Sequence, residues 1–449
     1  MKPNQLFILI DSLRSDRFFG EQKSCITPNI DKLRKNGVSF NQVISSADGT
    51  FLSLSSMLNS LHPSETGVRS RKVILHDKNY LEQLKNFGYH IYGIVPKFTS
   101  LNSVMNYFEN NDHTFEPEPP SAEYLHNGLG TKILDLFKSN KMLEPWFFFI
   151  HIHDLHWPLI VPENFSQSKF GESDYDKIIS SIDDWIGKFI DSINLDKTLV
   201  TITADHGQLI PFDEKGIENF EPEFKTILKT GKKLMPKFSQ NIGAKALDTL
   251  KKSIRDTRVK NANRNLSGYE KRSRLPYYTL SLFDELIKVP LLLSGYGIEK
   301  EKNIAQMVRT IDIFPTLAEI SNLPKNENKI HGTSLSQIIF NEKFIQLETL
   351  LHTIPYEKES GDDRIGIRTP EWKYFRHARN SQEEIHLYDL KNDPYENQNI
   401  AKEKPVIVKS MEEKISKILD HPLSSELHME DNLEEKKLIE DELKKMGYL

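Results

Sequence analysis

Short apolar runs alternate with longer stretches of helical spacing along most of the chain. Five such runs end at or near a polar or small residue, and they cover residues 6–10, 90–95, 146–152, 199–203 and 289–293. Near-continuous apolar strands separated by helices are typical of a mainly parallel sheet that helices cover on both faces. The pattern therefore predicts an α/β fold whose functional residues follow the carboxyl ends of the strands.

The pattern changes from about residue 347. Short strand-like pieces at 365–368, 372–376 and 385–388 precede a helical stretch at 405–419, and residues 432–446 have the spacing of an amphipathic helix. Short strands in succession favour an antiparallel arrangement. We therefore divide the chain into a catalytic domain, residues 1–345, and a smaller α+β C-terminal subdomain, residues 346–449, with a short antiparallel sheet and terminal helices.

Residues 211–275 interrupt the strand and helix rhythm. They contain no clear strand, and between residues 251 and 274 nine basic residues face two acidic ones. We interpret the segment as a basic helical insertion. Two roles remain open: a solvated surface element, or a lid over an anionic substrate.

Composition limits the classes of protein to consider. The 449 residues are 38% hydrophobic and 27% charged, which is enough to bury a substantial core. Lys and Arg number 59 against 64 Asp and Glu, so no basic excess indicates a nucleic-acid partner. The early apolar run of five residues is too short for a signal peptide or a membrane span. We expect a protein without a membrane span, in a reducing compartment such as the cytoplasm.

The single cysteine, Cys25, excludes an intramolecular disulfide and a thiolate metal site. Any metal ion must therefore bind carboxylates, imidazoles or hydroxyls.

Two of the apolar runs end in residues that bind divalent ions. Asp11 follows the first run, and Asp205 and His206 follow the run at 199–203. A carboxylate at the end of a buried strand is costly unless a cation or hydrogen-bond donors compensate it. Asp11 alone could equally cap the next helix. Together the three residues form a ligand set for zinc, manganese or calcium, with one position left open.

A third segment supplies hydroxyl groups. Residues 46–63 are rich in Ser and Thr, and they precede or begin a predicted helix. A helix N-terminus favours an anion, and a metal-bound hydroxyl there becomes a nucleophile. The alternative is that the hydroxyls only cap the helix.

The order of motifs along the chain resembles the sulfatase-like branch of the alkaline phosphatase superfamily, and the resemblance covers nearly all of the sequence. The matching segments are residues 9–16, 27–33, 59–68, 153–158, 204–207, 289–291, 311–317, 332–335, 388–396 and 443–449. The resemblance implies an alkaline-phosphatase-like fold. It also implies that Asp11, Asp205 and His206 hold a divalent ion and that His156 faces the anionic oxygens or the leaving group of the substrate.

The nucleophile position departs from the family pattern. Sulfatases of this branch use Cys or Ser, followed by Pro and Arg, and oxidise the first residue to formylglycine. Counting back from Pro63 places Thr50 at that position, with Leu52 and Leu54 where Pro and Arg stand. Threonine cannot be converted to the same aldehyde. Thr50 is therefore predicted both as a ligand of the ion and as the nucleophile, with Ser53, Ser55 and Ser56 as alternatives if the count is off.

These departures decide the predicted function. We predict a hydrolase or transferase of phosphate esters, acting on a phosphodiester or a phosphonate monoester, with one divalent ion or two as cofactor and an anionic ester as substrate. The alternatives are a sulfatase-like enzyme that acts on sulfate esters without formylglycine, and a non-catalytic binding protein with the same fold. Four further residues are left open: Lys97 and Lys288 between anion binding and surface, and His151 and His153 between strand-end structure, a second metal and proton transfer.

Overall fold

The computed structural model describes residues 2–68, 70–139, 141–210, 264–273, 281–298, 301–325, 329–353 and 363–420, with single positions or pairs between 253 and 261 and 437–439 and 441 near the C-terminus. Most of the predicted basic insertion and the predicted helix at 432–446 lie outside these residues.

Within the described residues, nine strands form one twisted sheet in the order β4-β3-β5-β1-β6-β7-β2-β8, with β9 also pairing with β2. Its strands are β1 (Asn4–Ile10), β2 (Gly37–Ile44), β3 (His90–Pro96), β4 (Thr114–Phe115), β5 (Trp146–Ile152), β6 (Thr198–Thr203), β7 (Lys288–Gly295), β8 (Lys302–Ile304) and β9 (Val308–Arg309). β7 is antiparallel to both of its neighbours, and the other pairs are parallel. All five apolar runs are strands, so the predicted mainly parallel sheet is confirmed.

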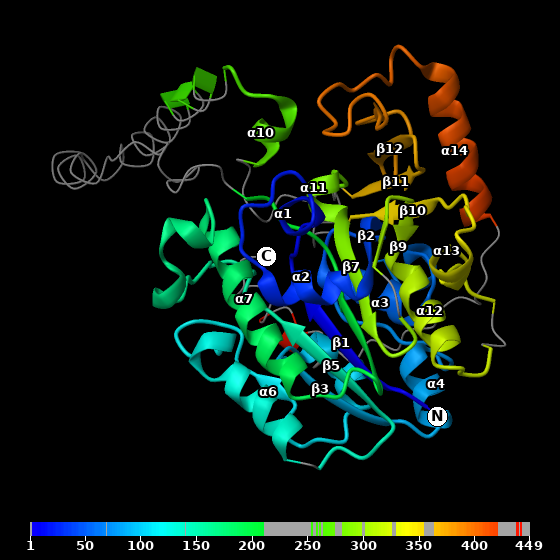
Figure 1. The fold of residues 1–449 in the computed structure, drawn as a ribbon. Coiled ribbons are helices and arrows are strands. Elements are labelled where there is room, and N and C mark those ends of the chain that lie inside the picture. Colours follow the sequence, from blue (N-terminus) through cyan, green and yellow to red (C-terminus); the bar gives the residue numbers. More distant parts are fainter. Residues whose placement is uncertain are drawn as a thin grey trace. The chain divides into compact units, whose positions relative to one another are not determined.

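Helices cover both faces of this sheet (Figure 1). α2, α6 and α7 lie together on one face, and α3, α4 and α12 on the other. The bounds of the helices that belong to this layer structure are α1 (Ser15–Phe18), α2 (Pro28–Lys35), α3 (Thr50–Asn59), α4 (Tyr80–Asn86), α5 (Asn102–Met105), α6 (Leu129–Lys138), α7 (Asp174–Asp191), α11 (Asp284–Ile287), α12 (Ile313–Ile320) and α13 (Ser336–Asn341). The apolar faces of both layers therefore enclose the central strands.

A second, antiparallel sheet follows in the order β10-β11-β12-β13. Its strands are β10 (Thr349–His352), β11 (Arg364–Arg368), β12 (Trp372–His377) and β13 (His386–Asp389), and the helix α14 (Pro405–Leu419) packs on it through Met411 and Ile415. The smaller antiparallel C-terminal part is therefore confirmed, although the boundary at residue 345 remains a prediction.

Residue contacts divide the chain into two compact units. The first comprises residues 1–208, 280–394 and 399–449, and includes both sheets; the second comprises residues 209–279 and 395–398. The second unit contains α10 (Gly268–Ser273), where Arg272 donates to the carbonyl oxygens of Tyr395 and Glu396. In the part of the chain that is described, no helix has the length and apolar character that a membrane crossing requires.

Candidate active site

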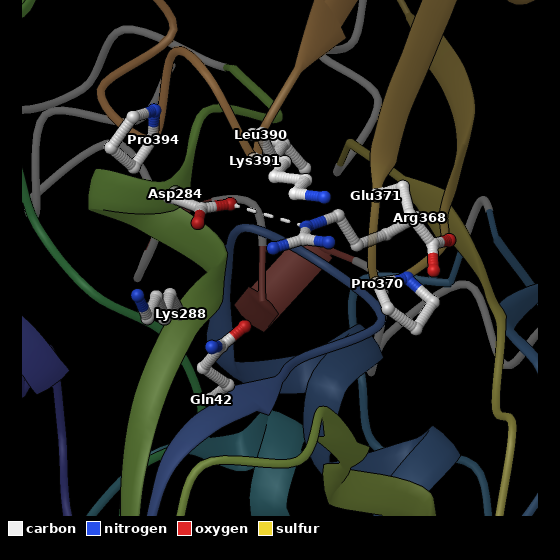
Figure 2. A pocket seen from close by; sticks show the side chains of 9 residues that line it. All are labelled: Gln42, Asp284, Lys288, Arg368, Pro370, Glu371, Leu390, Lys391 and Pro394. Atoms are coloured by element: carbon white, nitrogen blue, oxygen red, sulfur yellow. Dashed lines mark ion pairs between the residues drawn. The ribbon is translucent and has the colours of Figure 1, made fainter.

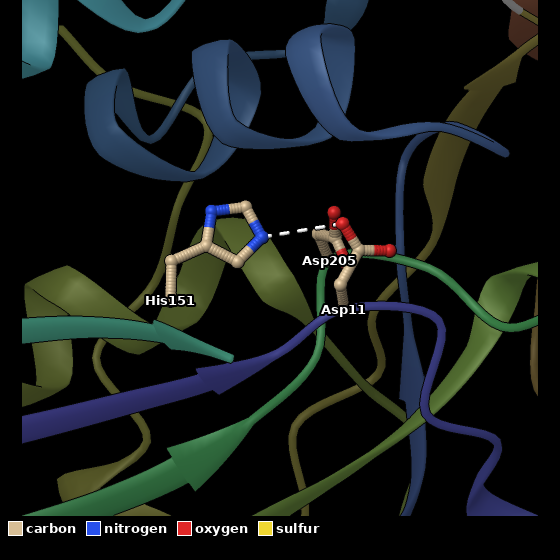
Figure 3. A group of neighbouring side chains, drawn as sticks. All are labelled: Asp11, His151 and Asp205. Carbon is tan, nitrogen blue, oxygen red and sulfur yellow. Dashed lines mark hydrogen bonds and ion pairs between the residues drawn. The ribbon is translucent and has the colours of Figure 1, made fainter. Parts of the chain in front are cut away.

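Three adjacent parallel strands deliver three side chains to one point. Asp11 directly follows β1, His151 is the last residue but one of β5, and Asp205 comes two residues after β6. β1 pairs with both β5 and β6, so the three residues meet at the carboxyl edge of the sheet, as Figure 3 shows. The local sequence accounts for this arrangement, because each apolar run fixes its strand and the polar residue marks its end.

The three side chains have the arrangement of a metal site. One ligand atom each from Asp11, His151 and Asp205 lies within 4.8 Å of the other two, and all three residues are buried. His151 donates from Nε2 to Asp11 Oδ2 at 3.2 Å. Among the described residues, Asp205 Oδ2 has no hydrogen-bond partner although it is buried. A buried carboxylate oxygen without a donor is well suited to a cation.

The pKa shifts of Asp11 and Asp205 also favour a cation at this site. Burial raises the pKa of Asp11, but the hydrogen bond from His151 and the charge of His206 outweigh burial, and the pKa lies well below its ordinary value. Burial, and then the charge of Asp11, raise the pKa of Asp205. One carboxylate therefore resists ionisation because the other is ionised next to it. These residues fit a divalent ion, which would compensate both charges and fill the position beside Asp205 Oδ2.

Thr50 lies at the edge of this site. It is the first residue of α3, and the preceding Gly49 has an extended backbone, so the helix begins at the threonine. Thr50 Oγ1 is 3.3 Å from Asp11 Oδ2 and 3.2 Å from His206 Nε2. The hydroxyl is thus next to both the ion site and the N-terminal end of a ten-residue helix, where free N–H groups favour an anion.

The alternative serines of α3 point elsewhere. Ser53 donates to the carbonyl oxygen of Ala47, and Ser55 donates to that of Phe51. The Ser56 hydroxyl lies 3.4 Å from the Thr66 hydroxyl. Of the four hydroxyls predicted as nucleophiles, Thr50 is therefore the one that the structure brings to the ion site.

His206 has one ring nitrogen occupied. Its Nδ1 lies 2.7 Å from the carbonyl oxygen of Gly207. A carbonyl can only accept, so the neutral ring carries its hydrogen on Nδ1 and keeps the lone pair of Nε2 toward Thr50. Nε2 is 3.6 Å from Asp11 Oδ1 and 3.6 Å from Asp205 Oδ2. Burial lowers the pKa of His206, but the charges of Asp205 and Asp11 outweigh burial, and the pKa is raised.

The backbone after His206 needs a glycine. A Cβ at Gly207 would lie 2.2 Å from the carbonyl oxygen of Glu285, while its N–H donates to the carbonyl oxygen of Leu286 at 2.8 Å. The chain that leaves β6 is therefore held against the chain that enters β7, and this contact fixes the position of the two preceding ligands.

His156 and His153 form the neighbouring wall. Their rings stack with centroids 4.3 Å apart, and both residues are buried. His156 Nδ1 lies 3.0 Å from the carbonyl oxygen of Trp157, so Nε2 is the acceptor of the neutral ring. Burial lowers the pKa of both histidines, that of His153 to well below its ordinary value.

Of the residues left open by the sequence, His151 belongs to the ion cluster, although a histidine inside an apolar run gave no clear signal. Lys97 is exposed beyond the end of β3, next to Phe98, whose ring lies 5.7 Å from that of His153. Lys288 lies at the start of β7 and lines a separate cavity. Leu54, which stands at the position of the family's arginine, is fully buried.

Comparisons with known proteins agree with this fold. The family model described as Sulfatase matches residues 3–323. A second model, described as N-sulphoglucosamine sulphohydrolase, C-terminal, matches residues 277–421.

The curated relatives include arylsulfatase K of Mus musculus, 29% identical over 159 residues, and arylsulfatase K of Homo sapiens, 29% identical over 162 residues. Each match covers 34% of this chain and about 30% of the relative, so it spans under a third of the relatives' length.

Solved structures resemble the chain over its whole length. Ps i-CgsB bound to k-i-k-neocarrahexaose has a TM-score of 0.61 at 17% identity and covers 100% of both chains. BT1596, a 2-O GAG sulfatase, has a TM-score of 0.59 at 18% identity, covering 100% of this chain and 93% of its own. At these identities the likeness shows the fold. Since the first family model alone matches more than half of the chain, the protein belongs to the sulfatase family.

Proposed function

We propose that the protein is a metal-dependent hydrolase of sulfate esters in which Thr50 is the nucleophile. The observation that carries this proposal is the position of the Thr50 hydroxyl, 3.3 Å from Asp11 and 3.2 Å from His206 at the start of α3. Family membership supports the sulfate ester, which was the alternative from sequence, over the phosphate ester.

The reaction takes place in two steps. Thr50 Oγ1 forms a bond to sulfur while the bond from sulfur to the ester oxygen breaks, and the alcohol or phenol leaves after gaining a proton. Water then attacks the sulfur and gives up a proton, the bond from sulfur to Thr50 Oγ1 breaks, Oγ1 regains its proton from His206, and inorganic sulfate is released. The proton of Thr50 passes to Nε2 of His206, which accepts hydrogen bonds in the neutral ring.

Asp11, His151 and Asp205 would hold the ion, with His206 and Thr50 beside them. When bound, a divalent ion supplies positive charge that stabilises the transferring group and lowers the pKa of the nucleophilic hydroxyl. Nε2 of His206 has one lone pair, so it cannot bind the ion while it accepts the proton of Thr50. In the first step His206 would therefore act as the base and not as a ligand of the ion.

His156 has a role in both steps. Because burial favours its neutral form, Nε2 accepts a hydrogen bond and can take a proton from the attacking water. A bound anion favours the protonated ring, which would then donate to the leaving oxygen.

A second candidate function is hydrolysis of phosphodiesters or phosphonate monoesters, and the threonine favours it. Thr50 cannot form the aldehyde on which the usual sulfatase cycle depends, whereas its hydroxyl, once its proton has passed to His206, can attack phosphorus from the same position. The two functions share every residue and differ in the substrate.

Paired substrates test both candidates. We expect purified protein, supplied in turn with calcium, manganese and zinc, to hydrolyse 4-nitrophenyl sulfate faster than bis(4-nitrophenyl) phosphate. The reverse preference would select the phosphodiesterase, and turnover of neither substrate with any ion would contradict both.

Variants assign the nucleophile. Thr50→Ala should lower kcat by about a thousandfold or more, while Ser56→Ala on the same helix should leave it unchanged. Ser56 is the matched control because its buried hydroxyl contacts Thr66 and not the ion site. An unchanged kcat in Thr50→Ala would remove the proposed mechanism.

A further inference from the structure

A second polar cavity lies where the start of β7 meets the antiparallel sheet. Its volume is about 260 Å³, and Figure 2 shows the side chains around it. The lining residues come from β2, α11, β7, the end of β11, the turn between β11 and β12, and the loop after β13: Gln42, Asp284, Lys288, Arg368, Pro370, Glu371, Leu390, Lys391 and Pro394. None of them belongs to the ion site described above.

The charge around this cavity is unbalanced. Lys288, Arg368 and Lys391 line it together with the carboxylates of Asp284 and Glu371, and Asp284 also binds Lys373 from outside the lining. Three cationic side chains and two carboxylates therefore line the cavity, and a further cation, Lys373, pairs with one of these carboxylates. Burial raises the pKa of Asp284, but the charges of Lys373, Arg368 and Lys288 outweigh burial and hold it well below its ordinary value.

Among the described residues, one N–H group of the Arg368 guanidinium has no hydrogen-bond acceptor. The residue is 2% exposed, and its Nη1 donates to the carbonyl oxygen of Thr369. Its Nε is 3.7 Å from Asp284 Oδ1, too far for a hydrogen bond, and within the described residues this buried atom has no hydrogen-bond partner. This N–H faces Asp284, and the guanidinium as a whole brings a buried positive charge to the wall of the cavity.

Lys288 and Lys391 add two cationic groups to the cavity that Arg368 lines. In the described part of the chain, neither Lys288 nor Lys391 has a carboxylate within ion-pair distance, and both line the cavity with Arg368. A planar guanidinium with two ammonium groups is a combination that recognises carboxylate, sulfate and phosphate oxygens.

The position of the cavity connects it to the nucleophile. Lys288 pairs with Ile44 at the carboxyl end of β2, and the N–H of Ser45 donates to the carbonyl oxygen of Ile287 at 2.7 Å. Five residues after Ser45 the chain reaches Thr50. β2, whose Gln42 lines the cavity, therefore leads directly into the loop that carries the nucleophile.

We propose that this cavity is a second anion-binding site, with Arg368, Lys288 and Lys391 as its ligands and an oxyanion of the carboxylate, sulfate or phosphate type as its occupant. The oxyanion can be a second charged group on the substrate, which rests on the proposed function, or a free anion. Either source has the same chemistry and the same ligands.

Binding is tested without turnover. Crystals of the metal-loaded protein soaked in selenate should show an anomalous peak within hydrogen-bonding distance of Arg368. In solution, the double variant Lys288→Gln, Lys391→Gln should bind inorganic sulfate at this site about tenfold more weakly, with chloride held at equal ionic strength. Lys409→Gln, which changes an exposed lysine of α14, should bind as the unaltered protein does.

Selenate found only beside Thr50, or equal sulfate binding by the double variant, would overturn the second site. Both measurements are independent of catalysis, so their failure differs from failure of the proposed function.

Kinetics separate the two sources. If the anion is part of the substrate, the double variant should raise KM about tenfold for an aryl sulfate with an additional carboxylate and leave KM for 4-nitrophenyl sulfate unchanged. If the anion is free, sulfate binding is weakened in the double variant and both KM values stay the same. KM raised equally for both substrates, with sulfate binding intact, would contradict the proposed site.

Discussion

Asp205 and Asp284 are two buried carboxylates near the same edge of the large sheet, and their surroundings differ in sign. Asp205 lies beside Asp11, whose charge raises its pKa, and one of its oxygens lacks a partner among the described residues. Asp284 lies beside Lys373 and Arg368, whose charges lower its pKa. The first carboxylate needs a cation from solution, while the second is compensated within the chain. A buried carboxylate thus indicates a cation-binding site where the protein does not itself supply the counter-charge.

The largest effect on stability is expected at the compensated carboxylate. Asp284→Asn should lower the free energy of unfolding by about 3–5 kcal/mol, because it removes the carboxylate that pairs with the fully buried ammonium of Lys373. Urea unfolding measures this change. Glu384→Gln removes a more exposed ion pair, with Arg364, and should cost less than about 1 kcal/mol. Equal losses in the two variants would contradict the distinction between them.

A third buried carboxyl group, that of Asp154, avoids a buried negative charge by keeping its proton. Burial raises its pKa to about 7, and Oδ2 has no partner among the described residues. Between about pH 4 and pH 7 the folded protein keeps a proton that the unfolded chain has lost. The free energy of unfolding should therefore fall as pH rises through that window, by at most about 4 kcal/mol, and then level off.

The variant Asp154→Asn isolates this contribution. Urea unfolding at several pH values should give a flatter profile for the variant than for the unaltered protein. The same fall with pH in both proteins would show that Asp154 is already ionised in the fold.

Ion binding tests the incomplete site. A divalent ion at about 100 times its dissociation constant should stabilise the protein by about 2.7 kcal/mol, and Asp11→Asn should abolish most of that gain. Thermal unfolding with and without calcium, manganese or zinc measures it. Asp184→Asn, which alters an exposed carboxylate of α7, is the control. Ion-dependent stabilisation that survives in Asp11→Asn would place the ion elsewhere.

The smallest effect has the opposite sign. In ion-free protein, Asp205→Asn should raise the free energy of unfolding by about 1 kcal/mol, because it removes the repulsion between two adjacent carboxylates. Urea unfolding in the presence of a chelator checks the sign. A loss of stability would mean that Asp205 is compensated by its protein neighbours alone, as Asp284 is.

The same contrast explains how far sequence reasoning reached. Asp11, Asp205 and His206 were predicted because they end apolar runs, which are local signals, whereas Thr50 was selected by counting back from Pro63 within the family motif. The cluster of Asp284, Arg368 and Lys373 has no such signal, since its members lie on α11, β11 and β12 and meet through packing between two sheets.

Strand prediction was limited in the same way. The sequence did not predict β2, because polar residues interrupt it and its pairing with β7 shifts register between Phe40 and Val43. Nor did it predict β10. Continuous apolar runs were predicted correctly, whereas strands whose partners are distant in sequence left no periodic pattern.

The hydrogen bond from Gly207 to Leu286 has a consequence for how this protein can change. The chain departs from the catalytic edge at Gly207 and is back within one hydrogen bond at Leu286, after almost eighty residues. Changes of length in that interval need not displace Asp205 and His206, provided that this hydrogen bond and Asp284 are kept. The interval can therefore diversify independently during evolution, and it is a natural place to graft a new recognition segment onto an unaltered catalytic scaffold.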